Sequence, residues 1–462
     1  QNPKTVKLKK LNKYILLEPP IGEGTFGKVY KCYEKDKYHK LYACKCLNID
    51  FYMSNPIFIQ KLRQELKVTK GLDHQNLVNL IDLKRTKHNL YMILDYINGD
   101  NLEVFLEKYF KAFSRAPSMN LIKHLSIEII SGLNYLGQRN IIHRDIKLEN
   151  IMFNIECEEK EDDSNKPNMQ QSDVQQLDSN SKYSITGEGL AISDGKEGNK
   201  DERKDININL NEIYWDKSEY PHPTSMKNSS QNPQALPIKR PKPNPAELKY
   251  KNKLTWTNYR EIEEIVLQSK CKIIDFGLGK DLKESGGITN SICGSPVTMA
   301  PEIWKNKLDG KNNKKGYDYM VDIWSTGCIL FNVYSSSPPF PGEEIENICY
   351  KVMSNGFYYL PLLNFNQSSS DVTVEFIDLI DSMLQYDTKI RIDWNQILQH
   401  PFLNVPISKQ VKFNDLLFHL NDGDKADLAV LNRMKKKEKN EYGGVVLSIN
   451  ERLNLLEVAK KK

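Results

Sequence analysis

The loop at residues 143–150 constrains this chain more than any other part of its sequence. It reads His-Arg-Asp-Ile-Lys-Leu-Glu-Asn and follows a helix that apolar spacing predicts over residues 121–136. Transfer of a phosphate to a hydroxyl needs a carboxylate that orients the hydroxyl and accepts its proton, and Asp145 suits that role. Lys147 can neutralise charge on the transferred phosphate, and Asn150 can hold a metal ion. The loop therefore predicts phosphate-transfer chemistry.

A second loop supplies the other half of this chemistry. Residues 272–274 read as a short buried strand that leads into Asp275-Phe-Gly. The carboxylate of Asp275 is the kind of oxygen ligand that Mg²⁺ prefers, and the ion neutralises phosphate oxygens. A chance occurrence of both loops in one chain is improbable. We therefore expect Asp145 to act with a metal ion that is held by Asn150 and Asp275.

Near the start of the chain, a glycine-rich stretch fits the pattern G-x-G-x-x-G-x-V. Glycine lets the backbone approach phosphates closely because it has no Cβ. The pattern is weak alone, since an ordinary glycine-rich hairpin or a dinucleotide-binding loop would also fit it. The flanking residues read as strands, whereas a dinucleotide loop would open a helix. A phosphate-covering hairpin is the preferred interpretation, and its residues are Gly22, Gly24, Gly27 and Val29.

A lysine and a glutamate farther along are predicted to pair. Lys45 lies in a predicted strand between small and apolar residues. The next segment predicts a helix, with Asn55-Pro at its start and Gly71 after its end. Glu65 shares the apolar face of that helix, where an unpaired charge would be costly. Lys45 is the natural partner, although a Glu65 that faces the boundary without such a partner stays open.

Taken together, these motifs resemble the eukaryotic Ser/Thr protein kinase family. The resemblance covers residues 14–403 apart from one insertion, and it extends to Ala-Pro-Glu at 300–302 and Asp-Ile-Trp-Ser-Thr-Gly at 322–327. It implies an α+β fold with two lobes, a strand-rich N-lobe at 14–97 and a helical C-lobe at 98–403. It also implies that ATP and Mg²⁺ are the cofactors and that Ser and Thr hydroxyls of protein substrates accept the phosphate.

The resemblance assigns roles to further residues. Glu302 would pair with Arg391 as a buried staple, and Asp322 would brace the catalytic loop through backbone hydrogen bonds. Leu94 looks like the gatekeeper of the adenine pocket, and it is followed by a hinge whose backbone reads adenine. The hinge would include Asp95 and Ile97, and the apolar walls of the pocket would be Ile21, Val29, Ala43 and Met152.

The resemblance also implies a phosphorylation switch in the segment after Asp-Phe-Gly. Ser295, in Cys-Gly-Ser-Pro, is similar to the residue that helps Ser/Thr kinases hold the acceptor, and we expect it to hydrogen-bond Asp145 and Lys147. Arg144 would lack a partner until a phosphate arrives. Ser291 lies four residues before Ser295 and resembles the usual activating site, although a plain surface serine stays open.

Two questions of class stay open at this point. The segments Cys-Gly-Ser-Pro-x-x-Met-Ala-Pro-Glu and Asn-Gly-Asp-Asn-Leu look most like the autophagy-initiating kinases and the calmodulin-dependent group. A pseudokinase scaffold is the alternative to an active enzyme, but such proteins usually lose at least one catalytic residue, and none is missing here. A kinase domain that also serves as part of a larger assembly is compatible with the sequence.

Composition adds an insertion and a tail to the predicted domain. Residues 155–270 are rich in Asn, Ser, Asp, Lys and Pro, which predicts a low-complexity insertion. Residues 404–462 form a tail with helix candidates at 427–440 and 448–456. Both regions are candidate contacts for assembly partners. Late in the insertion, Trp256 begins a set of apolar residues at helical spacing, which we expect to dock on another element.

Charge and cysteine content narrow the class further. The net charge of +5 comes from 65 basic and 60 acidic residues, a balance that does not favour nucleic acid as a partner. No apolar run approaches about 20 residues, so no membrane span is expected. Eight cysteines without a CxxC pair predict free thiols in a reducing compartment. We expect a cytoplasmic protein, with the nucleus or a cytoskeletal structure as alternatives.

Overall fold

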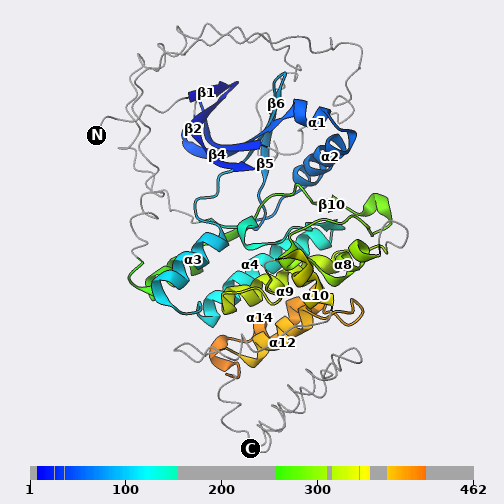
Figure 1. Cartoon of the computed structure of the whole chain (residues 1–462). Coiled ribbons are helices and arrows are strands. Elements are labelled where there is room, and N and C mark those ends of the chain that lie inside the picture. Colours follow the sequence, from blue (N-terminus) through cyan, green and yellow to red (C-terminus); the bar gives the residue numbers. More distant parts are fainter. Residues whose placement is uncertain are drawn as a thin grey trace, which may run out of the picture. The chain divides into compact units, whose positions relative to one another are not determined.

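The chain folds into two compact units (Figure 1). The computed structural model describes residues 8–24, 27–35, 37–154, 256–309, 315–342, 344–353 and 372–412. The first unit has its described residues within Gln1–Leu66 and Asn79–Tyr96, and the second has them within Lys67–Val78, Ile97–Glu156 and Asn252–Lys462. The helix candidates at 427–440 and 448–456, and residues 155–255 of the predicted insertion, lie outside the described residues.

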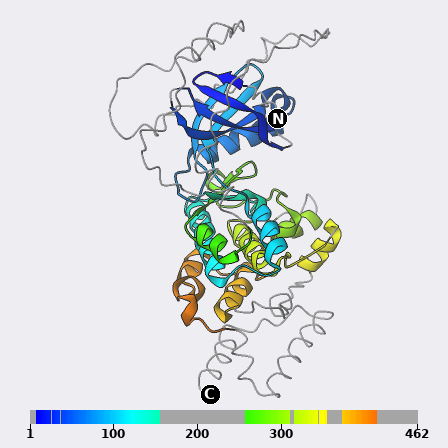
Figure 2. The same cartoon turned by 90° about the vertical axis from the view of Figure 1, so that its left-hand side faces the viewer.

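The first unit is built on a six-stranded antiparallel sheet with the order β1-β2-β3-β4-β6-β5. Figures 1 and 2 show this sheet from two directions. Strand β6 reads Leu-Tyr-Met-Ile-Leu between its ends, the continuous apolar run of a central strand with two covered faces. The strands are β1 (Leu8–Leu11), β2 (Tyr14–Gly24), β3 (Gly27–Glu34), β4 (Lys37–Asn48), β5 (Leu80–Arg85) and β6 (Asn89–Asp95).

The buried hydrophobic residues of this unit form two clusters. One cluster lies among the strands themselves and includes Tyr14 and Cys44. The other packs Leu62 and Leu66 of helix α2 (Pro56–Lys70) and parts of helix α1 (Ile49–Met53) against strand residues. The predicted start of α2 is confirmed, because Oδ1 of Asn55 accepts the N–H of Ile57 at 2.9 Å.

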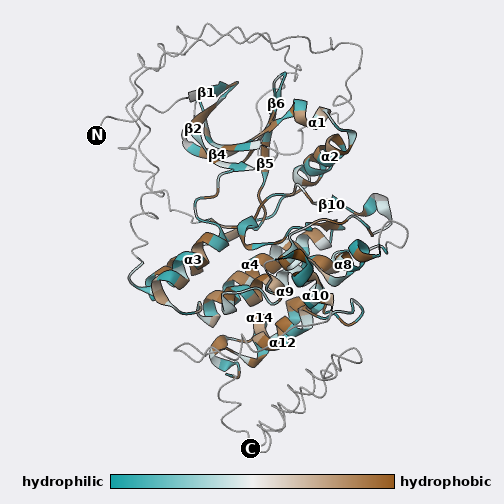
Figure 3. Cartoon of the chain, in the orientation of Figure 1, coloured by the Kyte–Doolittle hydropathy of each residue, from teal (hydrophilic) through white to brown (hydrophobic). Residues whose placement is uncertain are grey.

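The second unit is mainly helical. Its central helix is α9 (Met320–Ser335), which is buried along almost its whole length and packs against α4 and α12. In Figure 3 the ribbon of α4 and α9 is largely coloured for hydrophobic residues. The helix predicted at 121–136 is confirmed as α4. Besides α9, the helices of this unit are α3 (Leu102–Phe113), α4 (Met119–Gly137), α7 (Tyr259–Leu267), α8 (Pro301–Leu308), α10 (Ile345–Met353), α12 (Val374–Met383), α13 (Trp394–Gln399) and α14 (Pro401–Asn404).

Two short antiparallel strand pairs complete this unit and carry the loops of the site. Strand β7 (Ile141–Ile142) pairs with β10 (Lys280–Asp281), and β8 (Ile151–Asn154) pairs with β9 (Lys270–Ile273). The predicted staple is also present: both terminal nitrogens of Arg391 contact the Glu302 carboxylate, at 2.7 and 3.0 Å. The Arg391 side chain is fully buried, so this pair holds α8 to the segment before α13.

The units differ from the predicted lobes and insertion at three places. Residues Lys67–Val78 belong to the second unit, because their backbone binds β9 through Val78 N to Ile273 O at 3.0 Å and Ile273 N to Asn76 O at 2.8 Å. Helix α7 folds within the range predicted as insertion. Past residue 403 the chain stays bound, since Val374 N donates to Val411 O at 2.8 Å. Among the described residues, none of the helices is both long and apolar enough to cross a membrane.

Candidate active site

The glycine-rich stretch forms a hairpin in the first unit. Gly22 pairs with Val29 and Gly24 pairs with Gly27 across β2 and β3. A Cβ on Gly27 would lie 2.1 Å from the carbonyl oxygen of Cys46, so the strand can pass only with glycine there. Because a strand and not a helix follows the motif, the structure rules out the dinucleotide-loop alternative.

The predicted pairing of Lys45 with Glu65 is present. The two residues meet at 2.6 Å between Nζ and Oε1, and the glutamate side chain is only 7% exposed. An unpaired carboxylate at that depth would be costly, so Lys45 stabilises α2 against the sheet as well as presenting an ammonium group. The open alternative, a glutamate without this partner, is wrong.

Three of the residues predicted to surround adenine lie on one sheet face in this unit. Val29 lies opposite Lys45, and Ala43 lies opposite Leu94. Directly opposed residues in an antiparallel pair share a face, as do residues two apart on one strand. Val29, Ala43 and Leu94 therefore share the face of Lys45. Ile21 is half exposed beside the hairpin, Asp95 ends β6, and Ile97 and Met152 belong to the second unit.

Asp322 of helix α9 holds the backbone of the catalytic loop in the second unit. The buried Asp322 carboxylate on α9 accepts the backbone N–H of His143 at 2.7 Å and of Arg144 at 2.9 Å, as the resemblance implied. Burial raises the pKa of this carboxyl, while the two N–H donors oppose that effect. The brace holds Arg144 at a φ of 68°, a left-handed conformation that non-glycine residues seldom adopt. It fixes the backbone immediately before Asp145.

Asp145 is the centre of a cluster of polar side chains. Its carboxylate accepts the Ser295 hydroxyl at 2.7 Å and the Asn150 amide at 3.2 Å, and Lys147 Nζ lies 3.3 Å from it. The predicted contact of Ser295 with Asp145 is confirmed. The predicted contact of Ser295 with Lys147 is wrong for the described residues, because the lysine ammonium pairs with the carboxylate charge instead of the neutral hydroxyl.

The two predicted metal ligands come from adjacent strand ends. The N–H of Ile274 donates to the carbonyl of Asn150 at 2.9 Å, which places Asp275 next to Asn150. The Nδ2 atom of Asn150 is bonded to Asp145 O and Oδ2, so Oδ1 is the atom that can bind a cation. An amide oxygen and a carboxylate fit Mg²⁺, which usually takes one or two protein ligands and completes its shell with phosphates and water. In the described part of the chain there is no cage of three His, Cys, Asp or Glu side chains, the arrangement that other metals prefer.

A second basic residue joins Arg144 beside Ser291. Lys280 Nζ donates to Thr289 Oγ1 at 2.8 Å, and that hydroxyl lies 3.2 Å from Ser291 Oγ. Burial and the Arg144 charge lower the pKa of Lys280. Arg144 Nε binds the Leu278 carbonyl, while its buried Nη1 has no hydrogen-bond partner. The Arg144 charge also acts on Tyr317, whose hydroxyl donates to the Ser291 carbonyl at 2.5 Å. Ser291 thus lies close to two cations, one of which carries the unsatisfied donor. The sequence prediction missed Lys280, and its place three residues after Asp-Phe-Gly was the one available signal.

The catalytic loop of the second unit thus gathers around Asp145 the polar groups that phosphate transfer to a hydroxyl requires. The chain belongs to the protein kinase family, because the family model of the protein kinase domain matches residues 16–162 and 248–403.

Known relatives span several kinase groups. The chain is 23% identical over 398 residues to "Probable serine/threonine-protein kinase fhkD" of Dictyostelium discoideum, a match that covers 85% of this chain and 37% of the relative. It is 24% identical to "Calcium/calmodulin-dependent protein kinase type II" of Schizosaccharomyces pombe, over 85% and 58% of the two chains. It is 21% identical to "Serine/threonine-protein kinase ATG1" of Debaryomyces hansenii, over 83% and 34%. The chain thus spans about a third to three fifths of these relatives' lengths.

Proposed function

We propose that this protein is an active Ser/Thr protein kinase that transfers the γ-phosphate of ATP to protein hydroxyls. The observation that carries the proposal is the cluster around Asp145, in which Ser295, Lys147 and Asn150 all contact one carboxylate. A domain kept only as a scaffold has no need to hold these groups together. The intact Lys45–Glu65 pair supports the same conclusion.

Each residue then has a definable part in the transfer. Asp145 orients the acceptor hydroxyl, whose oxygen bonds to the γ-phosphorus while the bond to the ADP oxygen breaks, and it takes the released proton. Lys147 and Lys45 would neutralise phosphate charge. Asn150 and Asp275 would hold Mg²⁺, which when bound supplies charge neutralisation on the phosphate oxygens. Ser295 holds Asp145 in place through the 2.7 Å hydrogen bond.

The proposal is tested by transfer from ATP labelled at the γ-phosphate. The purified chain is given Mg²⁺ and peptide libraries whose fixed acceptor is Ser, Thr or Tyr. We expect label on the Ser and Thr libraries, and we expect EDTA to remove it because the metal is required. Label confined to the Tyr library, or hydrolysis of ATP without label on any peptide, would contradict the assignment.

We propose further that phosphate on Ser291 activates the enzyme. It would meet the unsatisfied Nη1 of Arg144 and the ammonium of Lys280, two cations that otherwise repel each other. Ser291→Ala should lower the transfer rate about tenfold or more in a sample phosphorylated elsewhere, because even one charge-assisted hydrogen bond contributes about 1.5 kcal/mol. Asn290→Ala, at the exposed neighbouring position, is the matched control. A Ser291→Ala enzyme with the wild-type rate would refute the switch.

We also propose that residues 155–270 and the tail 404–462 contact assembly partners. The polar composition of these regions outside α7 supports this, since polar low-complexity segments commonly bind partners. Both regions join the second unit at anchored ends, through α7 and through the contacts of Val411. A partner could therefore be bound without removing any catalytic group.

A further inference from the structure

Strands β8 and β9 flank the two candidate metal ligands, since Asn150 immediately precedes β8 and Asp275 lies two residues after β9, yet no tight turn joins the strands. Asn154 pairs with Lys270, so the whole stretch between these two residues replaces the turn of an ordinary hairpin. In a short hairpin the turn type and loop length set the register of the strands. A slip by one residue would move Asp275 by about 3.3 Å relative to Asn150 and reverse the faces of the strand. Something else in the fold must therefore hold this register.

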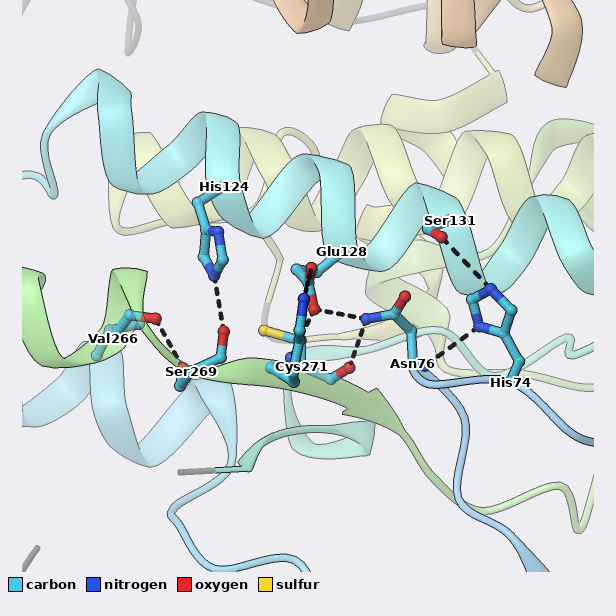
Figure 4. Close-up of polar contacts among 9 residues, drawn as sticks. His74, Asn76, His124, Glu128, Ser131, Val266, Ser269 and Cys271 are labelled. Atoms are coloured by element: carbon cyan, nitrogen blue, oxygen red, sulfur yellow. Dashed lines mark hydrogen bonds and ion pairs between the residues drawn. The ribbon is translucent and has the colours of Figure 1, made fainter. Parts of the chain in front are cut away.

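Each strand is held by a different helix. Strand β8 is bound to the start of α3, because Phe153 N donates to Asp100 O at 3.1 Å and the Phe153 ring packs on Phe105 at 4.9 Å. Strand β9 is bound to α4, because the Glu128 carboxylate accepts the N–H of Cys271 at 3.2 Å. Figure 4 shows this contact within a row of polar side chains along α4. The register of the two strands thus depends on how α3 sits against α4.

One buried carboxylate ties these two helices together. Oε1 of Glu263, on α7, accepts the hydroxyl of Tyr109 on α3 at 2.6 Å and the N–H of Ser118, the N-cap of α4, at 2.8 Å. Glu263 is 6% exposed, and neither of its two partners is a cation. A buried charge with two neutral donors is a costly way to gain packing alone.

Helix α7 is itself anchored at both ends. At its start, the Trp256 ring packs on Phe105 and Phe113 of α3, at 5.9 and 6.2 Å. At its end, Ser269 Oγ donates to the Val266 carbonyl at 2.7 Å, and the Ser269 carbonyl lies 3.0 Å from His124 Nε2 on α4 (Figure 4). The next residue, Lys270, begins β9. The helix therefore spans the gap between the element that holds β8 and the element that holds β9.

We propose that α7 replaces the missing turn and that Glu263 is a positioning residue for the Mg²⁺ site. By tying Tyr109 to Ser118 it keeps β8 and β9 in register, and so it sets the spacing between Asn150 and Asp275. This inference rests on the proposed kinase function for the identity of the metal site.

The test measures how ATP binding depends on Mg²⁺, without phosphate transfer. Glu263→Leu should raise the Mg²⁺ concentration for half-maximal ATP binding about tenfold, the lower end of what loss of outer support costs a metal site. Glu263→Gln should bind like wild type, because its amide oxygen can accept both hydrogen bonds. Glu264→Ala, on the exposed face of α7, is the matched control and should also bind like wild type.

Melting temperature without ligand separates positioning from plain packing. A Glu263→Leu protein that melts earlier but keeps its Mg²⁺ dependence within about twofold of wild type would overturn the inference. If Glu263→Leu does not fold, Tyr109→Phe decides, because it removes the phenol donor and keeps the ring. That variant should shift the Mg²⁺ dependence in the same direction, and an unchanged dependence would overturn the inference. A wild-type chain that binds Mg²⁺ and ATP but transfers nothing would contradict the proposed function alone.

Discussion

Asp145→Asn is expected to lower the rate of phosphate transfer about 10³-fold, within the range of a positioned general base. Asparagine keeps the size of the side chain but cannot take the proton of the acceptor hydroxyl. It also cannot form the ion pair that holds Lys147 Nζ at 3.3 Å. Ser295 and Asn150 donate to different oxygens of the carboxylate, so the one amide oxygen can keep only one of these two hydrogen bonds. Asn150 also donates to the backbone carbonyl of residue 145 at 2.9 Å, and that bond is unaffected, so the loop should keep its shape.

A stability measurement and a control variant accompany this rate measurement. The free energy of unfolding should change by less than about 1 kcal/mol, since no buried partner is removed. Asp309→Asn is the matched control, because that side chain is exposed and the change is chemically identical. A loss smaller than about tenfold with the fold intact would mean that another group accepts the proton.

Asp275→Asn is expected to reduce transfer about 10³-fold through the metal site. The carboxylate charge is the main protein attraction for Mg²⁺, and Lewis-acid stabilisation contributes several kcal/mol at about 1.4 kcal/mol per factor of ten. The substitution should not disturb the backbone. Asp275 has a φ of 62°, a conformation that asparagine adopts readily, and Oδ1 can still accept the N–H of Gly277.

This variant differs from Asp145→Asn in its metal dependence. Raising the Mg²⁺ concentration should recover part of the lost rate in Asp275→Asn and none of it in Asp145→Asn. Rates for both are measured over a range of Mg²⁺ at saturating ATP. Identical Mg²⁺ curves for Asp275→Asn and wild type would show that the carboxylate is not a metal ligand.

Short-range chemistry is what the sequence predicted well. The Lys45–Glu65 pair, which is present, follows from the cost of a carboxylate on an apolar helix face. The roles of Asp145 and Asp275 follow from residue types in contiguous loops and stay predictions. The short strand predicted before Asp275 is also present, as β9, which pairs with β8. These inferences depend on spacing within one element or on one obligatory partner.

Contacts between residues that lie far apart in the chain could not be predicted from the sequence. Glu263 looked like one of several polar residues in a polar segment, and its burial depends on Tyr109 and Ser118, far away in the chain. The role proposed for Lys280 depends on its 2.8 Å hydrogen bond to Thr289, which a sequence pattern does not reveal. The Lys147 contact was mispredicted for a related reason. Only three-dimensional placement decides whether that ammonium meets a hydroxyl or a carboxylate, and it lies 3.3 Å from the carboxylate of Asp145.

The central claim, an active kinase, is tested most directly by measuring label transfer and ATP binding in parallel for wild type and Asp145→Asn. Both proteins receive Mg²⁺, ATP labelled at the γ-phosphate and the Ser and Thr peptide libraries. The account predicts equal ATP binding in the two proteins and transfer that is about 10³-fold faster in wild type. Equal binding with equal and negligible transfer would contradict it and would identify the domain as a scaffold.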